Sequence, residues 1–108
     1  MVERRISLRA MIIRIVKMRF REDGIEAFKQ VFEERKELIR HFPGCRHLQL
    51  WQDENDKQLF FTFSKWDSVE MLNHYRFSPL FKETWALTKA LFAEKAQAWS
   101  VEQLAVME

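Results

Sequence analysis

Residues 42–66 constrain the fold most, because two apolar stretches of strand length enclose a purely polar hexapeptide there. The stretches at 45–51 and 58–66 are rich in aromatic residues and partly alternate between apolar and polar, a pattern typical of strands. Between them, 52–57 reads Gln-Asp-Glu-Asn-Asp-Lys, and Asp and Asn favour turns by bonding nearby backbone. We therefore predict a β-hairpin at the centre of a sheet. Pro43-Gly44 predicts the end of a preceding helix, since proline lacks a backbone donor.

The segments before the hairpin predict one strand and one helix. Residues 11–20 are dominated by β-branched side chains and are largely apolar on both faces, which indicates a strand covered on both sides. From 25 to 41, apolar residues recur with helical spacing on one face. Asp23 and Glu26 have the spacing of a capping box, so we expect Asp23 to cap this helix.

Two helices and a last strand are predicted after the hairpin. Asp67 and Glu70 repeat the capping pattern before a short helix at 69–77. Ser78-Pro79 then predicts a new helix over 79–94, with serine as N-cap and proline in the first helical position. A strand is expected over 97–104.

This β-α-β-β-α-β order predicts a ferredoxin-like α+β fold, a four-stranded antiparallel sheet with helices on one face. The opposite face would be bare, although the strand residues that point to it are largely apolar. We therefore expect a second copy of the sheet to cover it, giving a homodimer. Ten Phe, four Trp and one Tyr in 108 residues also exceed what one modest core holds, and indicate an interface or a pocket.

Charge and cysteine content limit the possible partners. Residues 1–10 hold three Arg and one Glu, which leaves 15 basic and 15 acidic residues in the remaining 98. The body of the chain therefore predicts no nucleic-acid partner, which would need a concentrated basic face. We expect 1–10 to be a disordered leader or a mis-assigned start, and 11–108 to be the domain. One cysteine, no long apolar run and no apolar signal core together predict a cytoplasmic protein without a membrane partner.

Three short motifs, in this order, resemble the antibiotic biosynthesis monooxygenase (ABM) family. They read Phe-Pro-Gly-Cys at 42–45, Phe-Phe-Thr-Phe-Ser-Lys-Trp at 60–66 and Ser-Pro-Leu-Phe-Lys at 78–82. The resemblance covers about 11–103 and implies a small dimeric α+β barrel. The family includes cofactor-free oxygenases of anthrones and quinols, as well as haem-degrading enzymes.

The resemblance implies no haem degradation. The haem-degrading branch has an Asn on the first strand, a Trp in the helix after the hairpin and a His one helix further on. The matching positions here hold Lys17, Tyr75 and Trp85. We therefore expect no cofactor and no metal, and the lack of clustered metal ligands in the sequence fits this expectation.

The other catalytic sets of the family match only in part. Members that resemble quinol monooxygenases often have a His three residues before the Ser-Pro pair and another just after it, where this chain has Tyr75 and Leu80. In the anthrone-oxidising branch the strand-final Trp accompanies an Asn four residues earlier and a Tyr six residues later. Trp66 matches that pattern, whereas Thr62 and Leu72 do not.

Five residues are candidates for the site. His74 is a possible proton acceptor and Tyr75 a possible hydrogen-bond donor to a phenolic oxygen, although they also fit a surface histidine and a core tyrosine. Trp66 and Trp85 are candidates for the flat walls of an aromatic pocket, or for packing alone. Lys17 would bind an anionic substrate oxygen, or extend along the sheet into solvent. We expect a pocket between helices and sheet, bounded by Trp66, Tyr75 and Trp85.

Two functions remain open at this point. The first is a cofactor-independent monooxygenase that combines a small quinol or anthrone type of aromatic with O₂ in a dry pocket. The second is a non-catalytic small-ligand-binding or stress-related protein with the same barrel. Convergence of His74, Tyr75 and Lys17 on one cavity would favour the enzyme, whereas side chains that point to solvent would favour the binding protein.

Overall fold

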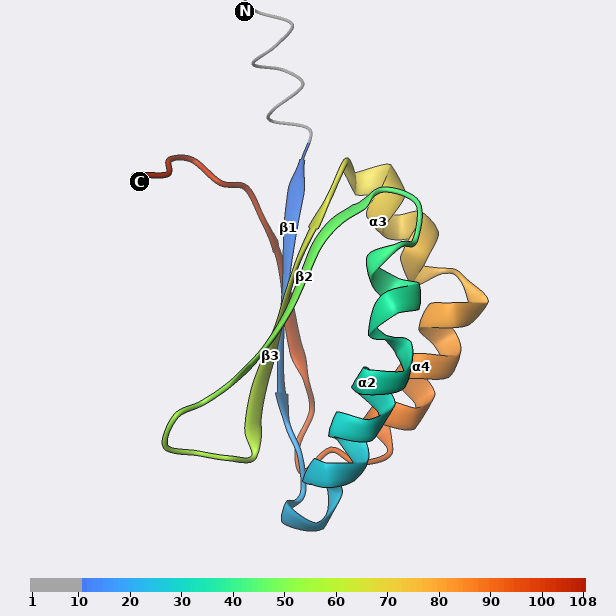
Figure 1. Ribbon diagram of the computed structural model, residues 1–108, viewed down its shortest axis with the longest axis vertical. Coiled ribbons are helices and arrows are strands. Elements are labelled where there is room, and N and C mark those ends of the chain that lie inside the picture. The colour runs from blue at the N-terminus through green and yellow to red at the C-terminus, as the bar shows by residue number, and fades with distance from the viewer. Residues whose placement is uncertain (1–10) are drawn as a thin grey trace, which may run out of the picture.

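The structure, a computed structural model, describes residues 11–108; the predicted leader at 1–10 lies outside them. Its elements are β1 (Ile12–Arg19), the short 3-10 helix η1 (Glu22–Gly24), α2 (Ile25–Arg40), β2 (Cys45–Gln52), β3 (Leu59–Trp66), α3 (Val69–Arg76), α4 (Pro79–Lys89) and β4 (Gln97–Val101). The strands form one antiparallel sheet in the order β2-β3-β1-β4. Figure 1 shows the sheet edge-on, with α2, α3 and α4 all on one side of it. The predicted ferredoxin-like α+β fold is confirmed.

The predicted hairpin is confirmed as β2 and β3, but its predicted place at the centre of the sheet is wrong for one strand. β3 pairs with β1 on its other side, whereas β2 is an edge strand, because β1 and not β2 lies next to β4. In its turn, the Asp53 carboxylate accepts hydrogen bonds from the backbone N–H groups of Asn55 and Asp56 at 3.0 and 2.8 Å. An ion pair between Asp56 and Arg19 fastens the turn to the end of β1. The acidic hexapeptide therefore both closes the hairpin and fixes it beside the neighbouring strand.

Both predicted aspartate caps are wrong. Asp23 lies inside η1, and α2 follows it directly with Gly24 at its N-cap position and no side-chain cap. At α3 the cap is Ser68, whose hydroxyl accepts a hydrogen bond from the backbone N–H of Met71 at 3.2 Å. Asp67 instead accepts two hydrogen bonds from the Arg46 guanidinium, at 2.7 and 2.8 Å. Arg46 lies at the β-bulge near the start of β2, next to the end of β3 that leads into Asp67.

The start of α4 is as predicted, with Ser78 as its N-cap and proline in the first turn. It ends earlier than expected, at Lys89, because the chain turns back to the sheet: Phe92 bridges Phe20, and the backbone N–H of Ala93 donates to a carbonyl of β1. The last strand also ends earlier than expected, at Val101. Val101 pairs with Ile13, and β1 extends only one residue further, to Ile12, so β4 has almost no partner strand beyond this point.

The helix side of the sheet holds the core. Met18, Phe20, Phe28 and Phe60 are almost fully buried there, and the rings of Phe20 and Phe28 stack 4.1 Å apart. Close to this layer, Gly44 has a φ of 89°, and a Cβ atom on it would lie 2.5 Å from that of Met71. Glycine is therefore required where the chain turns from α2 into β2 beneath α3.

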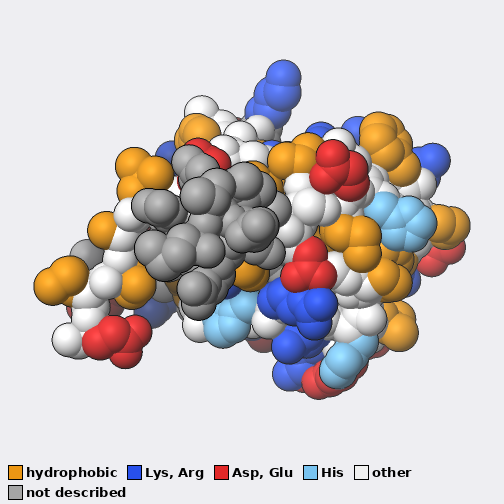
Figure 2. All heavy atoms as spheres, turned by 90° about the horizontal axis from the view of Figure 1, so that it is seen from above, with side chains coloured by type: hydrophobic (Ala, Val, Ile, Leu, Met, Phe, Trp, Pro, Cys, Tyr) orange, Lys and Arg blue, Asp and Glu red, His pale blue; other side chains and the backbone are white. Residues whose placement is uncertain are grey.

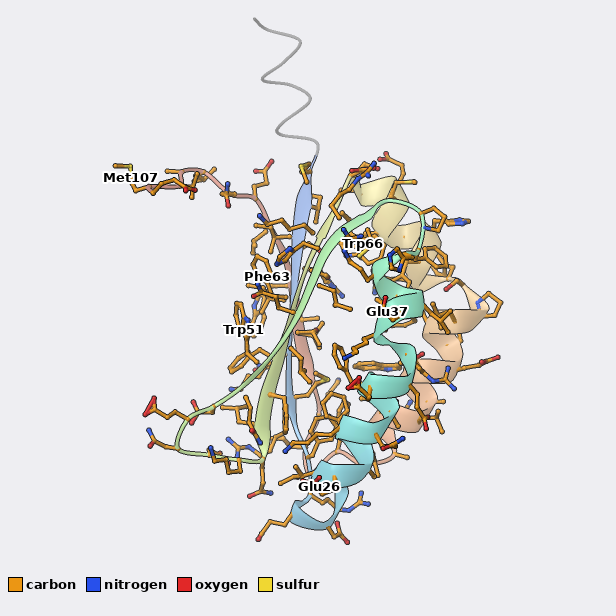
Figure 3. The ribbon with its side chains drawn as sticks, in the orientation of Figure 1. Glu26, Glu37, Trp51, Phe63, Trp66 and Met107 are labelled. Atoms are coloured by element: carbon orange, nitrogen blue, oxygen red, sulfur yellow. The ribbon has the colours of Figure 1, made fainter. Side chains whose placement is uncertain are left out.

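The opposite face of the sheet is largely apolar around Phe63 and Trp51, and none of the helices in residues 11–108 lies over it. Phe63 stacks on Trp51 with ring centroids 5.2 Å apart, and Figure 3 shows both pointing away from the helices. Trp51 and Trp99 are 41 % and 45 % exposed. Beyond β4, residues 102–108 extend from this side, and Figure 2 shows hydrophobic side chains projecting there, on the left.

Candidate functional site

A pocket of about 300 Å³ lies between the sheet and the helices, on the side where β3 ends in Trp66. Apolar and aromatic side chains from the helices form one wall. They include Phe28, Phe32, Ile39, Leu72, Tyr75, Phe81 and Trp85. The strands supply the opposite wall, called here the polar wall, in which Arg14, Thr62 and Ser64 stand among apolar side chains. The helices add Arg76, Thr84 and Thr88 to the polar lining. The pocket therefore suits a flat ligand that is apolar on one side and polar along one edge.

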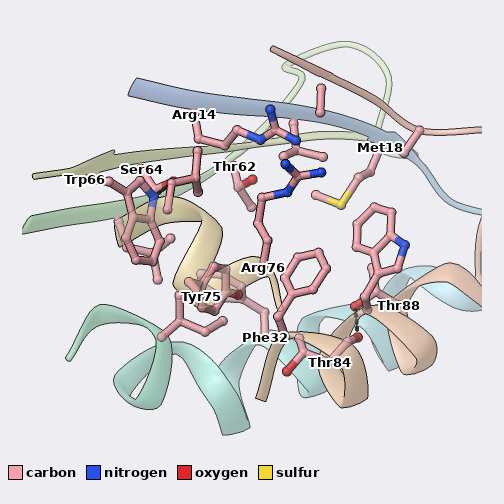
Figure 4. A pocket seen from close by; sticks show the side chains of 18 of the residues that line it. Arg14, Met18, Phe32, Thr62, Ser64, Trp66, Tyr75, Arg76, Thr84 and Thr88 are labelled. Atoms are coloured by element: carbon pink, nitrogen blue, oxygen red, sulfur yellow. Dashed lines mark hydrogen bonds between the residues drawn. The ribbon is translucent and has the colours of Figure 1, made fainter. Parts of the chain in front are cut away.

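Trp66 and Tyr75 form the closed end of this pocket. Trp66 is only 1 % exposed, and its indole N–H donates to the hydroxyl of Ser64 at 2.9 Å. The Tyr75 ring, from α3, stacks on Trp66 with centroids 4.8 Å apart and planes at 24°. Figure 4 shows both rings at the same end of the pocket. The indole is thereby held in one orientation by a hydrogen bond and a stacked ring.

The aromatic wall continues along α4. The Phe81 ring meets Tyr75 edge-on at 5.2 Å and stacks on Trp85 at 5.8 Å, with planes 10° apart. Phe81 and Trp85 are one helical turn apart, so they present parallel rings to the same side. An aromatic ligand would therefore find flat surfaces along the whole length of the pocket.

The Tyr75 hydroxyl remains protonated in this environment. Burial, with a smaller contribution from nearby Cys45, raises the pKa of Tyr75 well above its ordinary value. Among residues 11–108, no group forms a hydrogen bond with this hydroxyl. Tyr75 can thus donate a hydrogen bond to a ligand oxygen, but it cannot act as a base near neutral pH.

Two arginines, both absent from the sequence-based set, stand at the polar side of the pocket. Arg14 comes from β1 and Arg76 from the last turn of α3, and Figure 4 shows their guanidinium groups adjacent to each other. Burial and the charge of Arg76 lower the pKa of Arg14. No Asp, Glu or His is among the described residues that line the pocket. The charge inside it is therefore positive.

The predicted convergence of Lys17, His74 and Tyr75 on one cavity does not occur. Lys17 alternates with the pocket-facing residues of β1 and lies on the opposite face of the sheet, beside Phe61. His74 is exposed on α3, with its ring 5.4 Å from that of Phe42. The cause is geometric, because neighbouring residues on a strand face opposite ways and those on a helix point about 100° apart.

The comparisons with known proteins agree with this architecture. A family model described as antibiotic biosynthesis monooxygenase matches residues 11–87, which is more than half of the chain. The chain belongs to this family. A search of the curated proteins gave no significant match.

Solved structures resemble this ABM protein over most of its length. A conserved protein from Methanosarcina mazei Go1 has a TM-score of 0.84 at 14% identity, with 92% of this chain and 98% of that one covered. Rv0793 from Mycobacterium tuberculosis has a TM-score of 0.81 at 19% identity, with 91% of this chain and 99% of that one covered. A structure described as an antibiotic biosynthesis monooxygenase has a TM-score of 0.81 at 17% identity, with 87% of this chain and 99% of that one covered. At identities of 14% to 19%, these similarities show a shared fold and nothing more.

Within this ABM protein, the positions that match the haem-degrading set do not share one site. Tyr75 and Trp85 line the pocket, whereas Lys17 lies outside it. In residues 11–108 no group of three His, Cys, Asp or Glu side chains is placed to hold a metal ion. None of the helices in the described part of the chain is long and apolar enough to span a membrane.

Proposed function

We propose that this protein is a cofactor-independent monooxygenase that oxidises a small electron-rich aromatic compound of the quinol or anthrone type. The observation that carries the proposal is the aromatic-walled pocket between helices and sheet, with Trp66 and Trp85 at its walls and a protonated Tyr75 inside. Membership of the ABM family supports the reaction class.

The reaction needs little from the protein beyond its environment. A deprotonated quinol gives an electron to O₂ directly. One oxygen atom then enters the ring and the other leaves as water, so that quinol plus O₂ yields hydroxyquinone plus H₂O. Tyr75 donates a hydrogen bond to the substrate oxyanion, a contribution of roughly 2–4 kcal/mol when aligned. The rings of Trp66 and Trp85 hold the substrate flat and exclude water.

The first proton goes to solvent in this proposal. His74, the base expected from the sequence, is exposed outside the pocket, and Lys17 lies across the sheet. The described pocket residues include no carboxylate or imidazole that could accept the proton. We therefore assign no proton-accepting side chain. The substrate must be acidic enough to ionise on binding.

We further propose that the protein acts as a homodimer in the cytoplasm. The uncovered apolar face around Trp51 and Phe63 supports a dimer, and the family resemblance implies two sheets packed face to face. Its partners would be the second subunit, the small aromatic and O₂, with neither nucleic acid nor membrane. The single, buried Cys45 fits a reducing compartment.

A specific observation favours a second function, that of a non-catalytic small-ligand-binding or stress-related protein. The pocket is present, but His74, the proton acceptor expected from the sequence, does not line it. Such a protein would bind the aromatic compound and release it unchanged.

Oxygen uptake with a panel of quinols and anthrones tests the proposal. We expect Tyr75→Phe to lower uptake about tenfold or more, because a hydrogen bond to a developing anion is lost. Lys36→Gln, on the exposed side of α2, is the control and should match wild type. His74→Ala is measured as well, because only a loss of oxygen uptake in this variant would restore His74 as the proton acceptor expected from the sequence. Ligand binding without any uptake would establish the binding protein instead.

A further inference from the structure

Arg14 and Arg76 differ from most arginines in the described part of the chain, because neither has an acidic partner among residues 11–108. Arg19, Arg35 and Arg46 each form an ion pair with a carboxylate. Among residues 11–108, the only hydrogen bond of the Arg14 side chain goes from its Nη1 to the Ser100 hydroxyl at 3.0 Å, and the Arg76 side chain makes neither a hydrogen bond nor an ion pair. Two cations thus face one pocket without a counter-charge.

Repulsion between the two guanidinium groups, of which Arg14 is partly buried and Arg76 exposed, favours an anion between them. The lowered pKa of Arg14 reflects its partial burial and the nearby charge of Arg76, and both disfavour its charged form. An anion between the two guanidinium groups would relieve the repulsion. It would also accept the fork-like pairs of hydrogen bonds that arginine makes with carboxylates and similar oxyanions.

The position of the pair relative to the rings defines the ligand. Arg14 stands on the same face of β1 as Val16 and Met18, which line the pocket. Arg76 directly follows Tyr75 on α3. Figure 4 shows the two guanidinium groups on the sheet side of the pocket, with the aromatic rings at the end and along the helices. An anion held there would be attached to, or next to, the ring that lies on the aromatic wall.

We propose that Arg14 and Arg76 form an oxyanion-binding pair, and that the ligand is a one- to three-ring aromatic compound with a carboxylate or an ionised phenol on its ring. The volume of about 300 Å³, at the small end for ligand pockets, fits that size. Turnover of such a ligand rests on the proposed function, whereas its binding does not. An ionised phenol held by the pair would also explain how a substrate loses its proton without a protein base.

The first test compares two probes of the same shape, naphthoate and the uncharged naphthylmethanol, by calorimetry and by quenching of tryptophan fluorescence. We expect naphthoate to bind at least about tenfold more tightly, and Arg14→Gln and Arg76→Gln each to remove most of that preference. Arg46→Gln is the matched control, because its exposed guanidinium pairs with Asp67 outside the pocket. Equal binding of both probes, or an equal loss in the control, would overturn the proposal.

A second probe identifies the source of the anion. If the pair binds a phenolate, naphthol absorbance will show a lower pKa for the bound than for the free compound, and neither glutamine variant will cause this shift. A preference for naphthoate alone would assign the anion to a separate acid group. The absence of both effects would refute the oxyanion pair.

Two controls keep the test decisive. Arg14→Lys and Arg76→Lys retain the charge but lose the planar fork, so we expect an intermediate affinity for naphthoate. Thermal melts identify any variant that fails to fold. Oxygen uptake is measured separately. Arginine-dependent binding without uptake would support the oxyanion pair and contradict the monooxygenase. Uptake without a preference for the charged probe would support the monooxygenase and contradict the oxyanion pair.

Discussion

The two faces of the sheet are built from the same strands but differ in what covers them. On the helix side, Phe60 is 1 % exposed beneath α2, and polar side chains such as Arg14, Thr62 and Ser64 interrupt the apolar layer where it lines the pocket. On the other side, Phe63 and Trp51 stack on each other with no helix over them. Polar groups inside a covered layer indicate a ligand, whereas an apolar layer left uncovered indicates a partner.

The largest expected effect comes from comparing Phe60 and Phe63, which lie three residues apart on β3 and point to opposite faces of the sheet. Phe60→Ala should lower the free energy of unfolding by about 3–5 kcal/mol, because it leaves a cavity among Phe20, Phe28 and Met18. Phe63→Ala should cost much less in a protein dilute enough to be monomeric, since its ring is only half-buried there, against Trp51. Urea unfolding at several protein concentrations measures both. An equally large, concentration-independent loss for Phe63→Ala would contradict the distinction between the faces.

The next effect concerns assembly. Phe63→Asp should weaken self-association on the order of a hundredfold or more, because two carboxylates would be buried in a face that is apolar in both copies. Light scattering after size exclusion measures it. The control is Leu38→Asp, on the exposed side of α2, which should leave the dimer intact. A monomeric wild type at micromolar concentration would remove the dimer proposal altogether.

Much of the fold could be predicted because local chemistry decides it. Asp53 and its neighbours close the hairpin through their own side chains, and Ser78-Pro79 starts α4 whatever surrounds it. The wrong prediction at Asp67 concerns a residue whose partner is distant in sequence. Asp67 had a cap pattern, but Arg46 lies 21 residues away and binds it instead. Long-range partners of this kind cannot be recognised from spacing alone.

The site was less predictable for the same reason. Strand periodicity already put Arg14 on a face with Val16 and Met18, so a charged residue on an apolar stripe was a signal that could have been followed. Arg76 gave no such signal, since a helix-terminal arginine beside His74 resembles any solvent-facing residue. Only the packing of α3 over the sheet brings the two arginines together.

A smaller effect tests whether the polar wall also supports the structure. Ser64→Ala should lower the free energy of unfolding by about 1–3 kcal/mol, because the buried indole N–H of Trp66 loses its acceptor. Chemical denaturation monitored by fluorescence measures it, and Ser64→Thr, which keeps the hydroxyl, is the control. A neutral Ser64→Ala would mean that another group or a ligand satisfies the indole.

The smallest effect appears only at high pH, and it reports on the one tyrosine of the chain. Burial raises the pKa of Tyr75, so the native protein should show no tyrosinate absorbance at 295 nm near pH 10, where the denatured chain titrates. The unfolded state then releases a proton that the native state keeps. The contribution of Tyr75 to stability is therefore complete below about pH 10 and declines above it, and Tyr75→Phe should flatten that part of the curve. Because no residue of the uncovered face can contribute to this signal, a native titration near pH 10 with unchanged circular dichroism would show that water reaches the Tyr75 hydroxyl freely, and would contradict its burial at the end of the pocket.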